Sequence, residues 1–315
     1  MAGAPLVTGG TGFAGRHLIE HLLDRHPRIH AWSNPSGKRV SHGDPRVVWR
    51  AVDLLDREAV EREIAAIRPS AVYHCGGIAD VRATWTSPAR ALRVNVLGTS
   101  NVLNTVAETV PECPVLVTGS ALVYRPSTQA LTEDCPIGPS SPYGFSKLAQ
   151  EMMAQAVPAA AALIARPFNH AGPRQSDAFV ASAFARQIAE AEAGRREPVI
   201  KVGNLGARRD ITDVRDTVRA YCLLVERGRP ARPYNVCSGH AYLVQDLLDT
   251  LLGLARIPLA VVSDPTRMRP SDNPIVLGDA SRIRAETGWT PRIPIERTLA
   301  DLLDHWRTHV SASPA

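Results

Sequence analysis

Near its start the chain reads Pro5-Leu6-Val7-Thr8-Gly9-Gly10-Thr11-Gly12-Phe13-Ala14-Gly15, and the pattern of a helix follows from Arg16. The apolar residues before the glycines predict a short buried strand. Gly9, Gly12 and Gly15 suit a tight turn that lets a pyrophosphate approach the backbone, because a Cβ at these positions would obstruct it. The start of the next helix would offer free N–H groups and a positive dipole end to the phosphates. The stretch therefore predicts a dinucleotide site between a first strand and a first helix.

Three spaced glycines also occur in ordinary turns, so the rest of the N-terminal half decides their meaning. This half alternates short β-rich runs with helical patterns. We expect strands at 28–32, 47–52, 71–74, 114–118 and 157–166, and helices at 16–25, 58–67 and 96–108. Such alternation is typical of an α/β protein with a doubly wound parallel sheet, and it predicts a Rossmann-like fold.

Strands and helices alternate less regularly in the second half. Here we expect helices at 180–193, 214–227 and 243–254, with strands at 198–202 and 234–237 and a loop at 203–209. We assign residues 1–168 to a dinucleotide-binding Rossmann domain, with a return of the chain to its sheet near 211–237. Residues 169–210 and 238–315 would form a smaller domain that binds the substrate.

Composition and charge exclude several classes of protein. Apolar residues make up 44% and charged residues 21%, which indicates a globular chain rather than a disordered or fibrous one. The net charge of +5 favours an acidic partner. Because the basic residues are scattered and lack interleaved aromatics, we expect phosphates of small molecules and no nucleic acid.

Cysteine usage and hydropathy bear on location. The five cysteines lack metal-ligand or disulfide spacing, so we expect no metal and a reducing compartment. The start of the chain has no signal-peptide pattern, and no apolar run approaches the ~20 residues of a membrane helix. We therefore expect a cytoplasmic protein that does not bind a membrane.

The end of the second predicted strand bears on the choice of cofactor. An acid there would bind the ribose 2′-hydroxyl of NAD, but the sequence has Ser33 and Asn34, followed by Lys38 and Arg39. These four residues suit a 2′-phosphate, so we favour NADP(H) over NAD(H). Asp53, after the third strand, is placed either to meet the adenine ring or to cap the next helix.

A tyrosine and a lysine lie one helical turn apart, at Tyr143 and Lys147, in a helix that Ser141 would cap and Pro142 would begin. The ammonium beside the phenol would lower the tyrosine pKa toward working pH, and such a tyrosine can exchange a proton with a carbonyl or hydroxyl oxygen. Ser120 follows the fifth strand, at the sheet edge where ligands bind, and its hydroxyl could hold the same oxygen. The lysine could also reach a nicotinamide ribose. The three residues predict a nicotinamide-dependent oxidoreductase.

Together these residues resemble the extended short-chain dehydrogenases/reductases, a family that acts on nucleotide-linked sugars. The resemblance spans nearly the whole chain and includes the run Leu92-Arg93-Val94-Asn95-Val96-Leu97-Gly98-Thr99. It implies that Asn95 supports the catalytic lysine, and we also place Phe13 and Leu54 at the cofactor. It further implies a homodimer through the helices that begin near Asn95 and Tyr143.

The second half carries a more specific similarity, to GDP-mannose 4,6-dehydratases and GDP-4-keto-6-deoxymannose reductases. The matching runs are Arg166-Pro167-Phe168-Asn169-His170-Ala171-Gly172-Pro173, Val202-Gly203-Asn204-Leu205-Gly206-Ala207-Arg208-Arg209-Asp210 and Arg269-Pro270-Ser271-Asp272. This similarity implies that Asn169, Arg209 and Arg269 face the diphosphate of a GDP-linked sugar, and that Lys201 and Asn204 face the guanine. Arginine suits a diphosphate because its guanidinium can form two parallel hydrogen bonds with phosphate oxygens.

One difference from the dehydratases distinguishes dehydration from reduction in this chain. The dehydratases carry an acid after the serine or threonine of the fifth strand, because elimination of water across C5–C6 needs an acid/base besides the tyrosine. This chain has Ala121 and Leu122 there. We therefore predict reduction of GDP-4-keto-6-deoxy-D-mannose to GDP-D-rhamnose or its 4-epimer, with Tyr143 as the proton donor. Arg125, where such sequences usually have glycine, is not explained by the sequence.

Two other functions stay open at this point. An NAD-retaining nucleotide-sugar 4-epimerase would use the same tyrosine and serine, but it would keep its cofactor bound without net consumption. A non-catalytic dinucleotide sensor would need the glycine turn but not Ser120, Tyr143 and Lys147 together.

Overall fold

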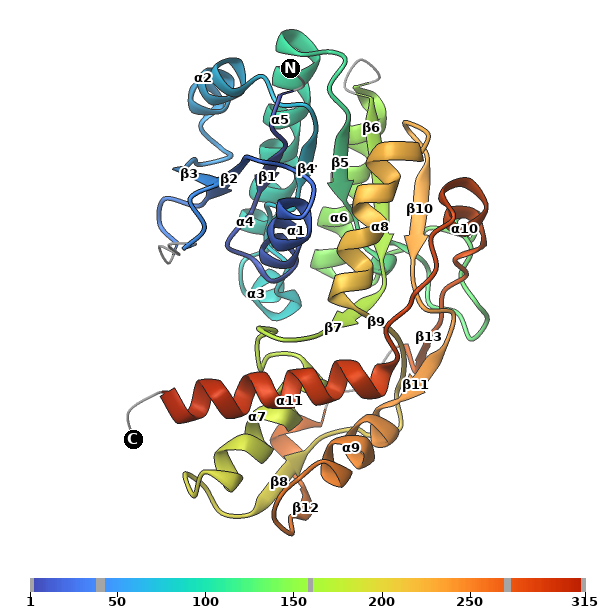
Figure 1. Ribbon diagram of the computed structural model, residues 1–315. Helices are drawn as coiled ribbons and strands as arrows, with labels where there is room; N and C mark the ends of the chain where they lie inside the picture. Colours follow the sequence, from blue (N-terminus) through green and yellow to red (C-terminus); the bar gives the residue numbers. More distant parts are fainter. Residues whose placement is uncertain (1–2, 38–42, 158–160, 269–272, 313–315) are drawn as a thin grey trace.

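The computed structural model describes residues 3–37, 43–157, 161–268 and 273–312. Its largest element is a parallel seven-stranded sheet with the order β10-β6-β5-β4-β1-β2-β3 (Figure 1). The strands are β1 (Leu6–Thr8), β2 (Ile29–Ser33), β3 (Val47–Ala51), β4 (Val72–His74), β5 (Val115–Thr118), β6 (Ala162–Pro167) and β10 (Pro233–Val236). The predicted doubly wound parallel sheet is confirmed.

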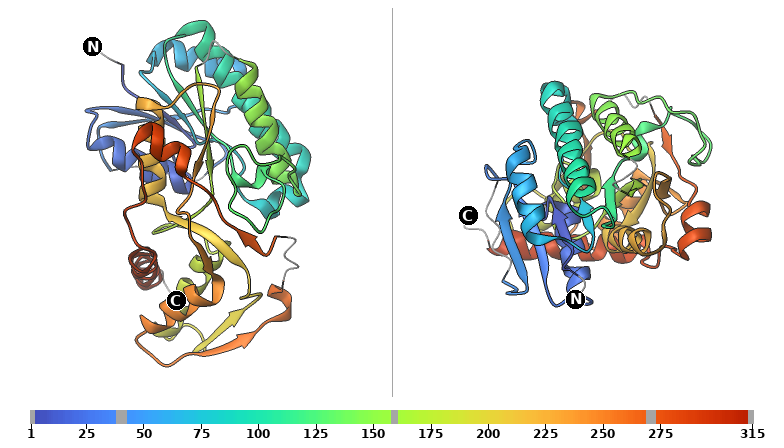
Figure 2. Two further views of the ribbon diagram at one scale, coloured as in Figure 1. Left: turned by 90° about the vertical axis from the view of Figure 1, so that its right-hand side faces the viewer. Right: turned by 90° about the horizontal axis from the view of Figure 1, so that it is seen from above.

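Helices cover both faces of this sheet (Figure 2). On one face α1 (Phe13–Leu23) packs against α8 (Val214–Arg227), and on the other α2 (Arg57–Ile67), α5 (Gly98–Thr109) and α6 (Pro142–Ala156) lie side by side. Short helical segments α3 (Val81–Thr86), α4 (Pro88–Leu92) and the π-helical turn η1 (Arg93–Leu97) precede α5. Successive strand residues point to opposite faces, which gives two separate apolar cores; Leu116 packs with α8 and Val115 with α5.

The remaining elements form a smaller body below the sheet in Figure 1. Its central strand β9 (Arg208–Asp213) pairs with β7 (Asn169–Ala171), β11 (Ala241–Leu243) and β13 (Ile275–Val276), while β8 (Val199–Val202) pairs with β12 (Ala260–Ser263). Helices α7 (Val180–Glu192), α9 (Val244–Gly253) and α11 (Ile295–Ala312) enclose a third apolar core. α10 (Ser281–Thr287) instead packs on α8 and β10. Among the described helices, none is both long and apolar enough to cross a membrane.

Most predicted elements lie within a few residues of the observed ones, but several predictions were wrong. α1 begins at Phe13, directly after Gly12, rather than at Arg16, so Gly15 lies inside the helix. The strand expected within 157–166 is β6, which begins at Ala162, later in this range than its first residue. The loop predicted over 203–209 contains the start of β9, and α11 was not predicted.

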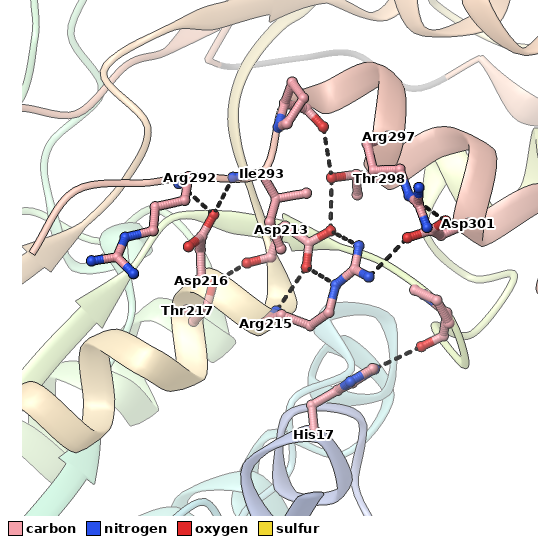
Figure 3. Close-up of polar contacts among 12 residues, drawn as sticks. His17, Asp213, Arg215, Asp216, Thr217, Arg292, Ile293, Arg297, Thr298 and Asp301 are labelled. Atoms are coloured by element: carbon pink, nitrogen blue, oxygen red, sulfur yellow. Dashed lines mark hydrogen bonds and ion pairs between the residues drawn. The ribbon is translucent and has the colours of Figure 1, made fainter. Parts of the chain in front are cut away.

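Two buried carboxylates tie the start of α8 to α11 (Figure 3). Asp213 caps α8 through the backbone N–H of Arg215 (2.8 Å) and also accepts a hydrogen bond from Thr298 Oγ1 on α11 (2.8 Å). The Arg215 guanidinium bridges Asp213 and Asp301, at 2.7 and 2.8 Å. Asp216 accepts the two backbone N–H groups of residues 292–293, just before α11 (2.8 Å each). These bonds hold α11 against the start of α8.

Candidate active site

The carboxyl ends of the parallel strands meet at one edge of the sheet. Because the strand order reverses between β1 and β4, a crevice opens there, and ligands of doubly wound proteins bind in such a crevice. The glycine turn follows β1, Ser120 follows β5, and the segment beginning at Asn169 follows β6. The predicted site residues of the first half therefore converge on this edge.

The glycine turn forms a cradle that side chains would fill. Gly9 has φ +64°, and a Cβ there would lie 2.7 Å from the carbonyl oxygen of Cys75. A Cβ on Gly15 would lie 2.3 Å from the carbonyl oxygen of Gly9. Gly12 precedes α1 without a side-chain capping bond, so the N–H groups of the first turn, which begins at Phe13, stay available for an anion. This geometry fits a pyrophosphate.

The end of β2 presents small polar groups. Ser33 is the last residue of the strand, and the side-chain oxygen of Asn34 accepts hydrogen bonds from the backbone N–H and the hydroxyl of Ser36 (2.9 and 2.8 Å). Lys38 and Arg39 lie outside the described residues. Their contact with a 2′-phosphate stays a prediction.

The turn after β3 decides between the two interpretations of Asp53. Its Oδ1 accepts the backbone N–H of Leu55 (3.0 Å), whereas Asp56 caps α2. The prediction that Asp53 caps the helix is therefore wrong, and a contact with adenine stays a prediction. Leu54 covers Gly76 at the end of β4, where a Cβ would lie 2.8 Å from Leu54 Cδ1.

The three predicted catalytic side chains come together. Ser141 caps α6, as predicted, and Tyr143 and Lys147 share one face of this helix, with Nζ 5.9 Å from the centre of the tyrosine ring. Ser120 Oγ accepts the backbone N–H of Leu122 (3.1 Å) and hydrogen bonds to the Tyr143 hydroxyl. A ketone oxygen beside this pair would meet two hydroxyl groups with a cation behind them.

The pKa values of this pair differ from the expectation. Burial raises the pKa of Tyr143 to about 12, although its hydrogen bond with Ser120 acts in the opposite direction. Burial also lowers the pKa of Lys147 to about 8, with the nearby Cys75 opposing. The predicted lowering of the tyrosine pKa is wrong, because the loss of solvent around the phenol outweighs the opposing hydrogen bond with Ser120. Tyr143 is therefore a phenol at neutral pH and has a proton to donate.

Hydrogen bonds hold the catalytic lysine in place. Lys147 Nζ donates to the carbonyl oxygen of Thr118 at the end of β5 (2.8 Å) and to Gln150 Oε1 (2.9 Å). Asn95 lies beside it on the π-helical turn, a feature that often marks functional positions. Gly77 passes over both groups, since a Cβ there would lie 2.7 Å from Asn95 Oδ1 and 3.9 Å from Lys147 Nζ.

A buried chain of hydrogen bonds joins β1 to this lysine, and sequence reasoning missed it. His74 lies between the hydroxyls of Thr8 (2.8 Å from Nδ1) and Thr99 (2.9 Å from Nε2). Thr99 donates its proton to the carbonyl oxygen of Asn95 (2.6 Å) and accepts from Gln150 Nε2 (2.9 Å). His74 must then donate from Nε2 and accept at Nδ1, as a neutral ring, which agrees with burial lowering its pKa to about 3.

A buried ion pair lies one turn further along α6. Glu151 accepts hydrogen bonds from Arg166 at 2.9 and 2.5 Å, and both side chains are only 4% exposed. The guanidinium also donates to the hydroxyl of Tyr124 (2.7 Å), just beyond the Ser120 turn. The spacing of Tyr143, Lys147 and Glu151 by four residues placed all three on one helix face and could have indicated this residue.

The position that would carry an acid in a dehydratase is apolar. Ala121 is buried and Leu122 is partly exposed directly after Ser120. Two buried carboxylates nearby are engaged: Glu151 binds Arg166, and Glu133 accepts a backbone N–H at 2.8 Å. Neither is free to move a proton.

Arg125 lies on the strand-like segment that follows. Its backbone N–H donates to the carbonyl oxygen of Pro136 (3.0 Å), and its side chain packs against Gly138. Nothing in the structure explains this residue.

The predicted substrate residues lie on the smaller body. Asn169 on β7 and Arg209 on β9 belong to paired strands, and the Asn169 amide donates to the β9 backbone (3.3 Å). Burial lowers the pKa of Arg209. Lys201 on β8 is exposed, and Asn204 lies in the turn that follows. Arg269 lies outside the described residues, so its contact with a diphosphate stays a prediction.

Comparisons with known proteins agree with this arrangement. The family model for GDP-mannose 4,6 dehydratase matches residues 6–302. A GDP-6-deoxy-D-mannose reductase from Pseudomonas aeruginosa is 34% identical over 310 residues, covering 96% of this chain and 97% of the relative. The structure of RMD from Pseudomonas aeruginosa complexed with NADPH has a TM-score of 0.86 and 32% identity, covering 98% of this chain and 100% of that chain. A UDP-glucose 4-epimerase from Bacillus subtilis is 27% identical over 335 residues, covering 96% of each protein.

Proposed function

Because this chain belongs to the GDP-mannose 4,6-dehydratase family, among the extended short-chain dehydrogenases/reductases, we propose that it reduces a GDP-linked 4-keto-6-deoxyhexose with a nicotinamide cofactor. The observation that carries the proposal is the set Ser120, Tyr143 and Lys147, followed by Ala121 and Leu122 in place of an acid. This set can deliver one proton and lacks the second acid/base that dehydration needs. The substrate would be GDP-4-keto-6-deoxy-D-mannose, and the product GDP-D-rhamnose or its 4-epimer.

The glycine cradle and the uncapped start of α1 fit the cofactor pyrophosphate. When bound, the reduced nicotinamide supplies the hydride for C4 of the sugar. Asp53 and Leu54 would border the adenine ring, Lys147 would hold the nicotinamide ribose, and Asn95 would keep that lysine in place.

Protonation of the substrate depends on the chain's own residues. Ser120 and Tyr143 hydrogen bond to each other and would both hold the C4 oxygen. Tyr143 gives its proton to this oxygen as the alkoxide forms. The ammonium of Lys147, held by the Thr118 carbonyl and Gln150, then stabilises the phenolate. The enclosed position of these groups strengthens both interactions.

A preference for NADP(H) over NAD(H) is part of the proposal. No carboxylate follows β2, and Ser33, Asn34, Lys38 and Arg39 offer donors and positive charge to a 2′-phosphate. The similar Pseudomonas aeruginosa structure is complexed with NADPH, which supports the same preference here.

The sugar nucleotide would bind between residues 1–168 and the smaller domain of residues 169–210 and 238–315. Asn169, Arg209 and Arg269 would face its diphosphate, and Lys201 and Asn204 its guanine. The pairing of β7 with β9, which brings Asn169 next to the Arg209 strand, supports the diphosphate assignment.

The chain would work as a homodimer. Large apolar side chains are exposed on α3, η1 and α6, at Trp85 (62%), Leu97 (52%), Phe145 (55%) and Met152 (60%). Such a group on neighbouring helices marks an interaction surface, and the helices near Asn95 and Tyr143 carry it. Sedimentation of Met152→Glu against wild type tests this, with a shift to monomer as the expected result.

A nucleotide-sugar 4-epimerase is the second candidate, favoured by the similarity to the UDP-glucose 4-epimerase and by the shared serine and tyrosine. It would keep bound cofactor through purification and interconvert two sugars without net oxidation. Purified reductase instead needs added NADPH.

The test is the loss of NADPH absorbance with a panel of GDP-, UDP- and dTDP-linked keto sugars. We expect oxidation with the GDP-linked 4-keto-6-deoxy sugar, and a loss on the order of 10²–10⁴ in kcat for Tyr143→Phe. No NADPH consumption with any keto sugar would refute the proposed function. Undiminished turnover in Tyr143→Phe would refute the assigned proton donor.

A further inference from the structure

One face of α1 contacts residues 170–174, which run from β7 into the segment that follows it. Phe13 stacks on His170, with ring centres 5.6 Å apart and planes within 5°. One turn along α1, His17 Nε2 lies 2.9 Å from the carbonyl oxygen of Pro173, a bond visible in Figure 3. A further turn along, Glu20 forms a two-fold ion pair with Arg174, at 2.6 Å for both hydrogen bonds. Successive turns of one helix therefore hold residues 170, 173 and 174 of one short segment.

The backbone of this segment is not relaxed. Arg174 has φ +73°, a left-handed conformation that disfavours residues with a Cβ. Its side chain reaches both Glu20 and His17 Nδ1 (3.1 Å). His17 thus donates to Pro173 and accepts from Arg174 as a neutral ring, consistent with burial lowering its pKa. The side-chain bonds compensate for an unfavourable backbone.

The two ends of this contact belong to two ligand sites. Phe13 directly follows Gly12 in the pyrophosphate cradle, and His170 directly follows Asn169, assigned to the substrate diphosphate. The junction is open to solvent on its outer side, where His17, Glu20, Arg174 and His305 line a cleft of about 630 Å³. On this side α1 contacts residues 170, 173 and 174, so a change at the start of α1 reaches this segment directly.

We propose that Phe13, His17 and Glu20, together with residues 170–174, form a latch through which cofactor binding orders the substrate loop. His17, Glu20 and Arg174 are positioning residues in this inference, which rests on the proposed function because it takes one ligand at each end of the latch. Since such coupling is reciprocal, an ordered loop also strengthens cofactor binding by the same factor.

Hydrogen exchange of the full chain, followed by mass spectrometry on a peptide covering 168–179, tests the latch with NADP⁺ as the only ligand. In wild type we expect NADP⁺ to slow exchange in this peptide by about fivefold or more. In Glu20→Gln we expect this slowing to be lost. The Kd for NADP⁺ rises by no more than the factor by which NADP⁺ slows exchange in wild type. The KM for the keto sugar rises while kcat changes little.

Three further variants separate the ion pair from other effects. Arg174→Gly keeps the left-handed backbone but removes the side chain, and we expect it to behave like Glu20→Gln. Arg25→Gln breaks an exposed pair between the residue just after α1 and Glu226 of α8, and it should behave like wild type. The swap of Glu20→Arg with Arg174→Glu restores the slowing.

The latch is overturned if NADP⁺ binds wild type without slowing this peptide, or if Glu20→Gln retains the full effect. Either outcome leaves the proposed function intact, because NADPH oxidation is measured separately. A chain that binds no nicotinamide cofactor refutes both.

Discussion

Replacing Glu151 by glutamine would show how much the buried ion pair on α6 contributes to the site. The change keeps the shape of the side chain but removes the charge that faces Arg166. Both side chains are 4% exposed, so the guanidinium would stay enclosed with no carboxylate beside it. Burial works against this cation, yet its hydrogen bonds with Glu151 and Tyr124 raise the Arg166 pKa above its ordinary value.

The size of the effect follows from the remaining partners. Removing one member of a buried pair costs about 3–5 kcal/mol, because the other charge is left uncompensated. Arg166 would still donate to the Tyr124 hydroxyl (2.7 Å) and the Glu133 carbonyl oxygen (3.3 Å). We therefore expect the lower end, a fall of about 3 kcal/mol in the free energy of unfolding.

Urea unfolding measures this fall in the free energy of unfolding, and we expect the slope of that free energy against urea concentration to stay unchanged. The assay contains no cofactor, because a bound ligand would add stability of its own. The matched control is Glu226→Gln, which breaks an ion pair whose side chains are 43% and 50% exposed, and it costs about 0–1 kcal/mol. The double variant Glu151→Leu with Arg166→Met replaces the pair by apolar groups and should be more stable than either single variant.

The reasoning fails if Glu151→Gln loses no more stability than Glu226→Gln. It also fails if the double variant is less stable than both single variants. The first result would mean that Arg166 finds solvent or another acceptor. The second would mean that apolar side chains do not replace the pair between α6 and β6.

Three further predictions concern the catalytic lysine, the cofactor and the buried histidine. Because burial lowers the pKa of Lys147 to about 8, its charge is present below that pH and lost above it, so kcat for keto-sugar reduction falls as the pH rises through about 8. In Lys147→Arg the fall moves to higher pH, and a flat wild-type profile across this range would contradict the role of the ammonium. Asn34→Asp places a carboxylate after β2 and lowers the ratio of kcat/KM for NADPH over NADH by roughly tenfold or more; an unchanged ratio would place the 2′-phosphate elsewhere. His74→Leu removes two buried hydrogen bonds, each worth about 1–1.5 kcal/mol, so urea unfolding should show a loss of about 2–3 kcal/mol, and undiminished stability would contradict the buried chain.

Local features of the site could be predicted from the sequence. The glycine spacing, the Ser141 cap and the one-turn separation of Tyr143 and Lys147 are short-range patterns, and each was found where expected. α11 could also have been predicted, because Ile295, Leu299, Leu302 and Leu303 follow a helical period. Short strands such as β9 could not, since their charged residues hide any alternation and only pairing defines them.

The buried polar contacts depend on residues far apart in the chain. His74 bonds to Thr8 and Thr99, which are 66 and 25 residues away, and a sequence pattern gives no distance between them. The pKa of Tyr143 was predicted in the wrong direction for a similar reason. The sequence shows the lysine four residues on, but not how much solvent the fold removes from the phenol.

This raised pKa bears on the choice between reduction and epimerisation. A reductase uses Tyr143 as an acid, and a phenol with a pKa of about 12 is protonated throughout the neutral range. An epimerase begins by oxidising its substrate, so the same residue must first accept a proton as phenolate. With a pKa of about 12, few molecules carry that phenolate at neutral pH, and Lys147, whose own pKa is lowered to about 8, stabilises it only while charged. The raised pKa of Tyr143 agrees with its assignment as the proton donor in ketone reduction.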